Sequence, residues 1–70
     1  MLSLIKIFTR LGDRQHLVRE KAFEEFALLT FDSDEAEVCI NYITMMYNSR
    51  RWEDRFGAIR ASVVLAKTCF

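Results

Sequence analysis

Apolar residues recur at spacings of three and four along almost the whole chain, and this pattern predicts an all-helical protein. The sequence contains no proline and only two glycines, so signals for strands and tight turns are scarce. The first apolar stripe predicts a helix over about 2–11 and consists of Leu4, Ile5, Phe8 and Leu11. Gly12 follows directly, and glycine is suited to the left-handed conformation that ends many helices.

Two further helices are expected in the middle of the chain. The second spans about 17–30, and its apolar stripe is Val18, Ala22, Phe23, Phe26 and Leu29. For the third helix we expect Asp34 to cap the start and Glu37 to reach back from three positions later, as in a capping box. This helix runs to about Tyr47, where Asn48 is a second residue suited to a left-handed stop.

The fourth expected helix begins near Trp52 and carries Glu53 and Asp54 in its first turn, where acidic side chains are favoured by the helix dipole. Its apolar stripe is nearly continuous to Phe70 and consists of Trp52, Phe56, Ile59, Val63 and Ala66. The expected architecture is therefore all-α, with four helices arranged as two antiparallel helical hairpins in a single unit over 1–70.

The second half of the chain repeats the first with a period of 36 residues. Pairs at the same position of the two copies include Leu4 and Ile40, Leu11 and Tyr47, Arg14 and Arg50, Arg19 and Arg55, Ala22 and Ala58, and Phe23 and Ile59. Two copies of a helical hairpin, about 2–30 and about 35–69, explain these matches, and periods of this length are typical of helical solenoids. The small side chains of Ala22 and Ala58 would let the paired helices approach closely, and Gly57 adds further room.

The segment 18–26 resembles the second helix of a HEAT repeat, in which Val-Arg is followed, after two variable residues, by Ala and an apolar position. Asp13 fits the turn aspartate of that family, whereas the second copy has Ser49 there. The resemblance implies an α-solenoid whose function is that of a scaffold or a protein-interaction module within a larger protein. Arg19 lies in a first turn, where the helix dipole favours an acid, so we expect it to form a salt bridge with Asp13.

Composition and residue chemistry exclude several functions. Ten basic and ten acidic residues give a net charge of zero, which argues against a free-standing nucleic-acid binder. His16 is the only histidine and has no nucleophile at a useful spacing, and Cys39 and Cys69 lack the paired spacing of a zinc site. No apolar run is long enough to cross a membrane. We therefore expect no enzymatic activity, no cofactor, no metal and no membrane partner, and an intracellular location, cytoplasmic or nuclear.

The most informative candidates for binding are the basic residues near the two hairpin turns, Arg14, Arg50, Arg51 and Arg55, together with Trp52. Equivalent turns lie side by side along one edge of a solenoid, so these residues would form a contact edge for an acidic protein surface. A flat aromatic side chain beside arginines is typical of interface hot spots. Two alternatives are that Trp52 packs into the core while the arginines only solubilise the turns, and that a small helical bundle binds nucleic acid through these turns.

Apolar residues at both ends of the chain give a further expectation. Two repeats usually cannot cover both outer faces of a solenoid. We therefore expect an apolar exposed end, to be covered by further helical repeats or by self-association. The residues concerned are Leu2, Leu4, Ile5, Val64, Leu65 and Phe70.

Overall fold

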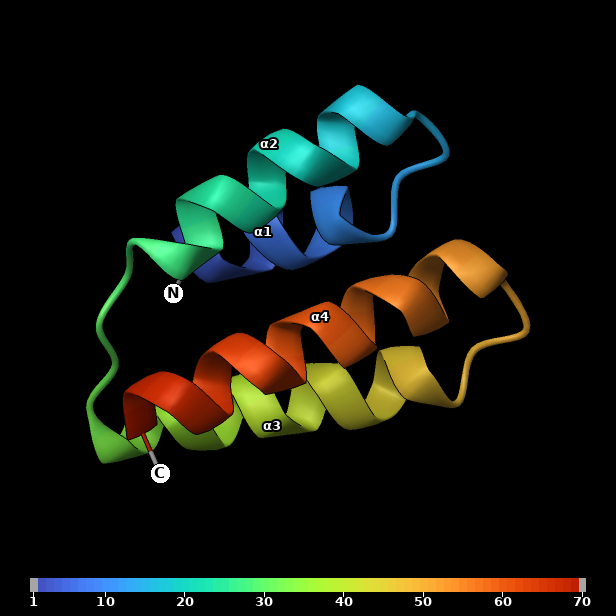
Figure 1. The fold of residues 1–70 in the computed structure, drawn as a ribbon. Coiled ribbons are helices and arrows are strands. Elements are labelled where there is room, and N and C mark those ends of the chain that lie inside the picture. Colours follow the sequence, from blue (N-terminus) through green and yellow to red (C-terminus); the bar gives the residue numbers. More distant parts are fainter. Residues whose placement is uncertain (1, 70) are drawn as a thin grey trace.

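The computed structural model describes residues 2–69 as four helices joined by short connections (Figure 1). The helices are α1 (Leu2–Leu11), α2 (His16–Ala27), α3 (Ser33–Tyr47) and α4 (Trp52–Cys69). α1 pairs with α2, α3 pairs with α4, and the two hairpins lie side by side with α4 against both helices of the first hairpin. The prediction of an all-α fold built from two helical hairpins is confirmed.

The second helix ends three residues earlier than expected. It stops at Ala27, and the amide of Leu28 donates to the carbonyl of Glu25 while the amide of Leu29 donates to that of Phe26. Beyond this point the chain still packs on the core, because the rings of Phe26 and Phe31 lie 5.3 Å apart. Because the apolar spacing continues past the end of the helix, the predicted helix was too long.

The start of α3 is capped by a different pair of acids from the expected one. Asp32 accepts a hydrogen bond from the amide of Glu35 at 2.8 Å, and the Glu35 carboxylate accepts one from the amide of Asp32 at 3.2 Å. This is the reciprocal capping box, but it lies two residues before the predicted Asp34 and Glu37. Both pairs have the same acid-x-x-acid spacing, so the spacing alone did not distinguish them.

The two predicted left-handed stops are also wrong, because no described residue has a positive φ. Asn48 has φ −90° and ψ 4°, and its side-chain amide donates to the carbonyl of Thr44. Gly12 is needed for space instead, since a Cβ there would overlap the carboxylate of Asp54. Among the described residues, α1, α2 and α3 therefore end without the left-handed residue that a Schellman motif uses.

Aromatic rings join three of the helices at the centre of the core. The ring of Phe8 lies edge-on to that of Phe26 at 5.3 Å and stacks on that of Tyr42 at 5.0 Å. Phe8 and Phe26 are almost completely buried, as is Cys39 of α3. Offset and edge-on ring pairs of this kind add to the stability that burial alone supplies.

Small residues bring α4 close to the first hairpin. Gly57, Ala58 and Ala61 are buried on the inner side of α4. A Cβ on Gly57 would lie only 2.6 Å from the backbone carbonyl oxygen of Leu11. Ala22, at the same position of the first hairpin as Ala58, is likewise fully buried. The spacing of the two hairpins is therefore set by backbone contact rather than by long side chains.

Two ion pairs tie the helices together at the surface. Arg10 of α1 pairs with Glu25 of α2, and Arg60 of α4 pairs with Glu20 of α2. The hydrogen bond from each arginine lowers the pKa of its glutamate below the ordinary value of 4.5. Both pairs are partly exposed, so their contribution to stability is modest.

We expect Gly57→Ala to lower the free energy of unfolding by about 1–2 kcal/mol, because overpacking against a backbone group outweighs the gain in helix propensity of about 1 kcal/mol. Gly12→Ala is the matched control, since its Cβ meets a side-chain carboxylate that can move. Urea unfolding followed by circular dichroism measures both. An equal or larger loss in Gly12→Ala would contradict the close approach at Gly57.

We expect the free energy of unfolding to fall at acid pH, and part of this fall to come from protonation of Glu20 and Glu25. Because the pKa of Glu20 and Glu25 is lower in the folded state than in the unfolded chain, their stabilisation is present above about pH 4.5 and is lost as the pH falls through the folded-state pKa. The urea midpoint of the double variant Glu20→Gln, Glu25→Gln should decline less between pH 6 and pH 3 than that of the native chain. Parallel declines would show that these pairs contribute nothing.

Candidate interaction surfaces

The two hairpin turns lie at the same end of the molecule, as the sequence predicted for the contact edge (Figure 1). Arg14 is exposed in the α1–α2 turn, and Arg50 is exposed in the α3–α4 turn. Trp52 begins α4 and remains 54% exposed, so the alternative that it anchors the core is wrong. These three side chains are accessible to a partner.

The other two arginines of the predicted edge are engaged within the molecule. Arg51 donates to the carbonyl of Gly12 at 2.7 Å, which connects the two turns, and its guanidinium lies 3.7 Å from the carboxylate of Asp54. Arg55 donates to the carbonyls of Ser49 and Arg50 at 3.0 and 2.9 Å. The edge is therefore less basic than four arginines in sequence suggest.

Arg19 does not form the expected salt bridge with the carboxylate of Asp13. Its guanidinium donates instead to the backbone carbonyls of Asp13 and Arg14, at 2.8 and 2.9 Å, while the Asp13 carboxylate accepts from the amide of Gln15 at 2.8 Å. Arg19 is only 6% exposed, and its guanidinium carbon lies 5.0 Å from the centre of the Trp52 ring. Carbonyl oxygens and an aromatic face thus take the place of an acidic partner.

The same hydrogen-bonding arrangement occurs at the turns of both hairpins. Arg19 donates to the carbonyls of residues 13 and 14, and Arg55 donates to those of residues 49 and 50. Donors and acceptors are all displaced by 36 positions, which is the period found in the sequence. An arginine in the first turn of the second helix therefore fastens each turn from inside.

The apolar stripe of α4 that stood out in the sequence faces solvent. Its larger members are between 39% and 54% exposed, namely Trp52, Phe56, Ile59 and Val63, and Ala66 is exposed as well. The buried side of α4 is made instead by smaller residues, chiefly Ala58, Ala61 and Leu65. A helix with apolar residues on both sides gives no unique prediction of its buried face.

The expectation that apolar residues at the two chain ends are exposed is largely wrong. Leu4, Val64 and Leu65 are buried, at 3%, 9% and 3% exposure, and only Ile5 is exposed as expected, at 42%. The side chains of Leu2 and Phe70 lie outside the described part of the molecule. Exposed large apolar side chains occur on all four helices, and the most exposed are Leu17 of α2 and Leu28 directly after it, at 81% and 84%.

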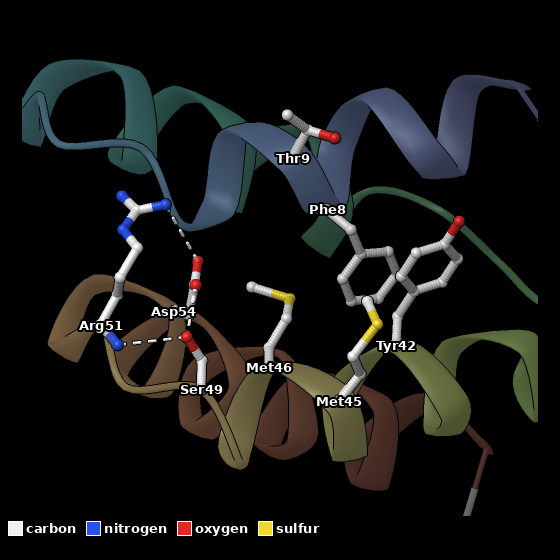
Figure 2. Close-up of a pocket in the computed structure, with 8 residues that line it drawn as sticks. All are labelled: Phe8, Thr9, Tyr42, Met45, Met46, Ser49, Arg51 and Asp54. Atoms are coloured by element: carbon white, nitrogen blue, oxygen red, sulfur yellow. Dashed lines mark hydrogen bonds and ion pairs between the residues drawn. The ribbon is translucent and has the colours of Figure 1, made fainter.

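An apolar groove of about 370 Å³ lies between α1 and α3 (Figure 2). Phe8 and Thr9 line the groove from α1, and Tyr42, Met45 and Met46 line it from α3. At one end the polar groups satisfy one another, because the Ser49 hydroxyl donates to the carboxylate of Asp54 at 2.8 Å and accepts from the amide of Arg51 at 3.1 Å. The adjacent Met45 and Met46 were the sequence signal for this groove, which sequence reasoning missed.

Histidine, cysteine and acidic side chains are dispersed over the described part of the molecule. His16 is exposed at the start of α2, and no three histidine, cysteine or acidic side chains among residues 4–67 come together in a way that could hold a metal ion. None of the four described helices is both long enough and apolar enough to span a bilayer. No family model, curated protein or solved structure matches the chain significantly.

We expect Arg19→Lys to lower the free energy of unfolding by about 2 kcal/mol, because a lysine keeps the charge but loses the planar group that reaches two carbonyls and covers an aromatic ring. Arg55→Lys is the matched variant in the second hairpin, where the arginine is less buried, and its loss should be smaller. Guanidinium unfolding followed by the fluorescence of Trp52 and by circular dichroism gives both values. A larger loss for Arg55→Lys would contradict this order.

Proposed function

We propose that this chain is a non-catalytic helical-repeat module of the HEAT type that binds other proteins and serves as a scaffold within a larger assembly. The observation that carries the proposal is the repeated hydrogen bonding of Arg19 and Arg55, each to the two carbonyls of its own turn, 36 residues apart. Repetition of the same local device in successive hairpins is what a solenoid requires. The resemblance of the segment 18–26 to the family pattern supports the same assignment.

The binding surface in this proposal is the corner formed by Arg14, Arg50 and Trp52. Both arginines expose their guanidinium groups, whereas their backbone carbonyls are held by Arg19 and Arg55. The turns are therefore fixed before a partner arrives, which reduces the entropy lost on binding. Free guanidinium groups beside a half-exposed indole suit an acidic protein surface that also offers an apolar side chain.

Arg51 and Arg55 have a positioning role in this surface. Arg51 links its own turn to the carbonyl of Gly12, and Arg55 closes the turn in which Arg50 lies. Only two arginines of the original four remain for a ligand, and the net charge of the chain is zero. Few phosphate contacts are then available, which favours a protein partner over nucleic acid.

The proposal predicts that the corner captures specific proteins. Immobilised native chain is compared with the double variant Arg50→Glu, Trp52→Ala, using a cell lysate and quantitative mass spectrometry. We expect at least one protein to be retained about tenfold less by the variant, because hot-spot residues carry most of an interface's binding free energy. The retained protein is then purified and its binding measured directly by the change in fluorescence of Trp52, the single tryptophan.

The matched control is Lys21→Glu, which makes the same kind of charge reversal at an exposed position of α2. Its captured proteins should equal those of the native chain. Retention that the double variant leaves unchanged would refute the corner as the binding surface. Retention that disappears after nuclease treatment would instead support the nucleic-acid alternative.

A further inference from the structure

The side of α2 that faces away from the rest of the molecule exposes two leucines. Leu17 and Leu28 are 81% and 84% exposed, the highest values among the large apolar side chains that the structure describes. Lys21 and Glu24 lie between them and are exposed as well. Because eleven residues make about three helical turns, and Leu28 keeps helical angles of φ −88° and ψ −10° directly after α2, all four side chains lie on one side. We call these four residues the α2 ridge.

The α2 ridge is opposite the side of α2 that packs in the core. α2 lies at the edge of the four-helix arrangement and packs against α1 and α4 (Figure 1). Its buried residues, Arg19, Ala22 and Phe26, lie on the other side of the helix. The α2 ridge is therefore accessible to a second molecule.

The two charges at the centre of the α2 ridge are available for a partner. Within the described part of the molecule, neither Lys21 nor Glu24 forms an ion pair or a side-chain hydrogen bond. The adjacent Glu25 is held by Arg10, whose hydrogen bond lowers the pKa of that carboxyl, with a smaller effect from Lys21. The α2 ridge thus presents one free cation and one free anion between two leucines.

The order of these residues is self-complementary. They are four, three and four positions apart, so the spacing is the same from either end of the α2 ridge. When a second copy lies antiparallel, each Leu17 meets Leu28 of the other copy, and each Lys21 meets Glu24. A parallel arrangement in register would instead place like charges opposite each other, which is unfavourable. The charge pattern therefore specifies an antiparallel contact between two identical ridges.

The equivalent positions of the second hairpin already form a helix contact. They lie 36 residues later, where Gly57 touches the backbone of the first hairpin, Arg60 pairs with Glu20, and Val64 is 9% exposed. The α2 ridge thus occupies the positions through which a hairpin of this protein contacts its neighbour. With Lys21 in place of glycine, such backbone contact has no room, so the matching surface must be held further away by side chains, as a second ridge is.

We infer that two copies of this chain associate through their α2 ridges, antiparallel about a two-fold axis. In this isologous contact both copies use the same residues, so association stops at two. Four leucines and two ion pairs make a contact smaller than a standard interface, and we expect a weak dimer with a dissociation constant of about 0.1–1 mM.

Exchange of the two charges tests this inference. Sedimentation of the full chain with a reductant, from about 20 μM to about 2 mM, should show the average mass rising from 8.3 kDa toward twice that value. Lys21→Glu and Glu24→Lys each place like charges opposite each other, so either should raise the dissociation constant at least about fivefold. An equimolar mixture of the two variants should recover association, because every acid of one then meets a lysine of the other.

Ile59→Asp is the control for a charge placed on an exposed apolar position elsewhere, since Ile59 is 52% exposed on α4. Its dissociation constant should equal that of the native chain, whereas Leu17→Asp should weaken the dimer. Circular dichroism before each run establishes that every variant is folded. A monomer at every concentration, species larger than a dimer, or a mixture that associates no better than its components would each overturn the inference.

This contact does not depend on partner binding through the corner of Arg14, Arg50 and Trp52. The double variant Arg50→Glu, Trp52→Ala should therefore dimerise as the native chain does while it loses capture of a partner. Lys21→Glu should do the reverse, because it weakens the dimer and leaves the corner unchanged. Loss of dimerisation in the corner variant would contradict the α2 ridge as the site of contact.

Discussion

The backbone contact between α4 and the end of α1 is the constraint on which the arrangement of the two hairpins depends. Because Gly57 lies directly against the carbonyl of Leu11, α4 is close enough for Arg60 to reach Glu20 and to cover Phe23. Arg60 makes these two contacts only at that spacing of the helices. A side chain at position 57 would act as a spacer and separate groups that are well removed from it, since close-packed interiors transmit such displacements.

Arg19 and Arg55 organise the backbone of the two turns rather than balancing acids. Arg19 is buried in a first turn, where the helix dipole disfavours a cation, yet it satisfies two turn carbonyls and lies on the ring of Trp52. A charged donor gives stronger hydrogen bonds than a neutral one. Arg19 holds the carbonyl of Arg14 and Arg55 holds that of Arg50, while Arg14 and Arg50 themselves are exposed.

Helix number and hairpin pairing followed from the sequence because apolar spacing and the 36-residue period are global signals. The predictions were wrong where the sequence supported two local interpretations equally well. Asp32 and Asp34 each have an acid three residues later, and α4 has apolar residues on both sides, with the larger ones on the exposed side. Only tertiary contact decides such cases: the small residues of α4 face inward, where Gly57 meets the backbone of Leu11 and Ala58 is fully buried. The turn carbonyls as partners of Arg19 had no signal in the sequence.

The two hairpins share a pattern but present different chemistry to solvent. Lys21 and Glu24 of the first hairpin match Gly57 and Arg60, the residues through which the second hairpin contacts the first. They lie on the side of the first hairpin that faces away from the second. On the opposite side of the molecule the pattern remains apolar at Ile40 and Ile59, which are 42% and 52% exposed. A solenoid end needs a polar outer surface to remain soluble. The side that carries Lys21 and Glu24 has such a surface, whereas the side that carries Ile40 and Ile59 exposes apolar groups instead.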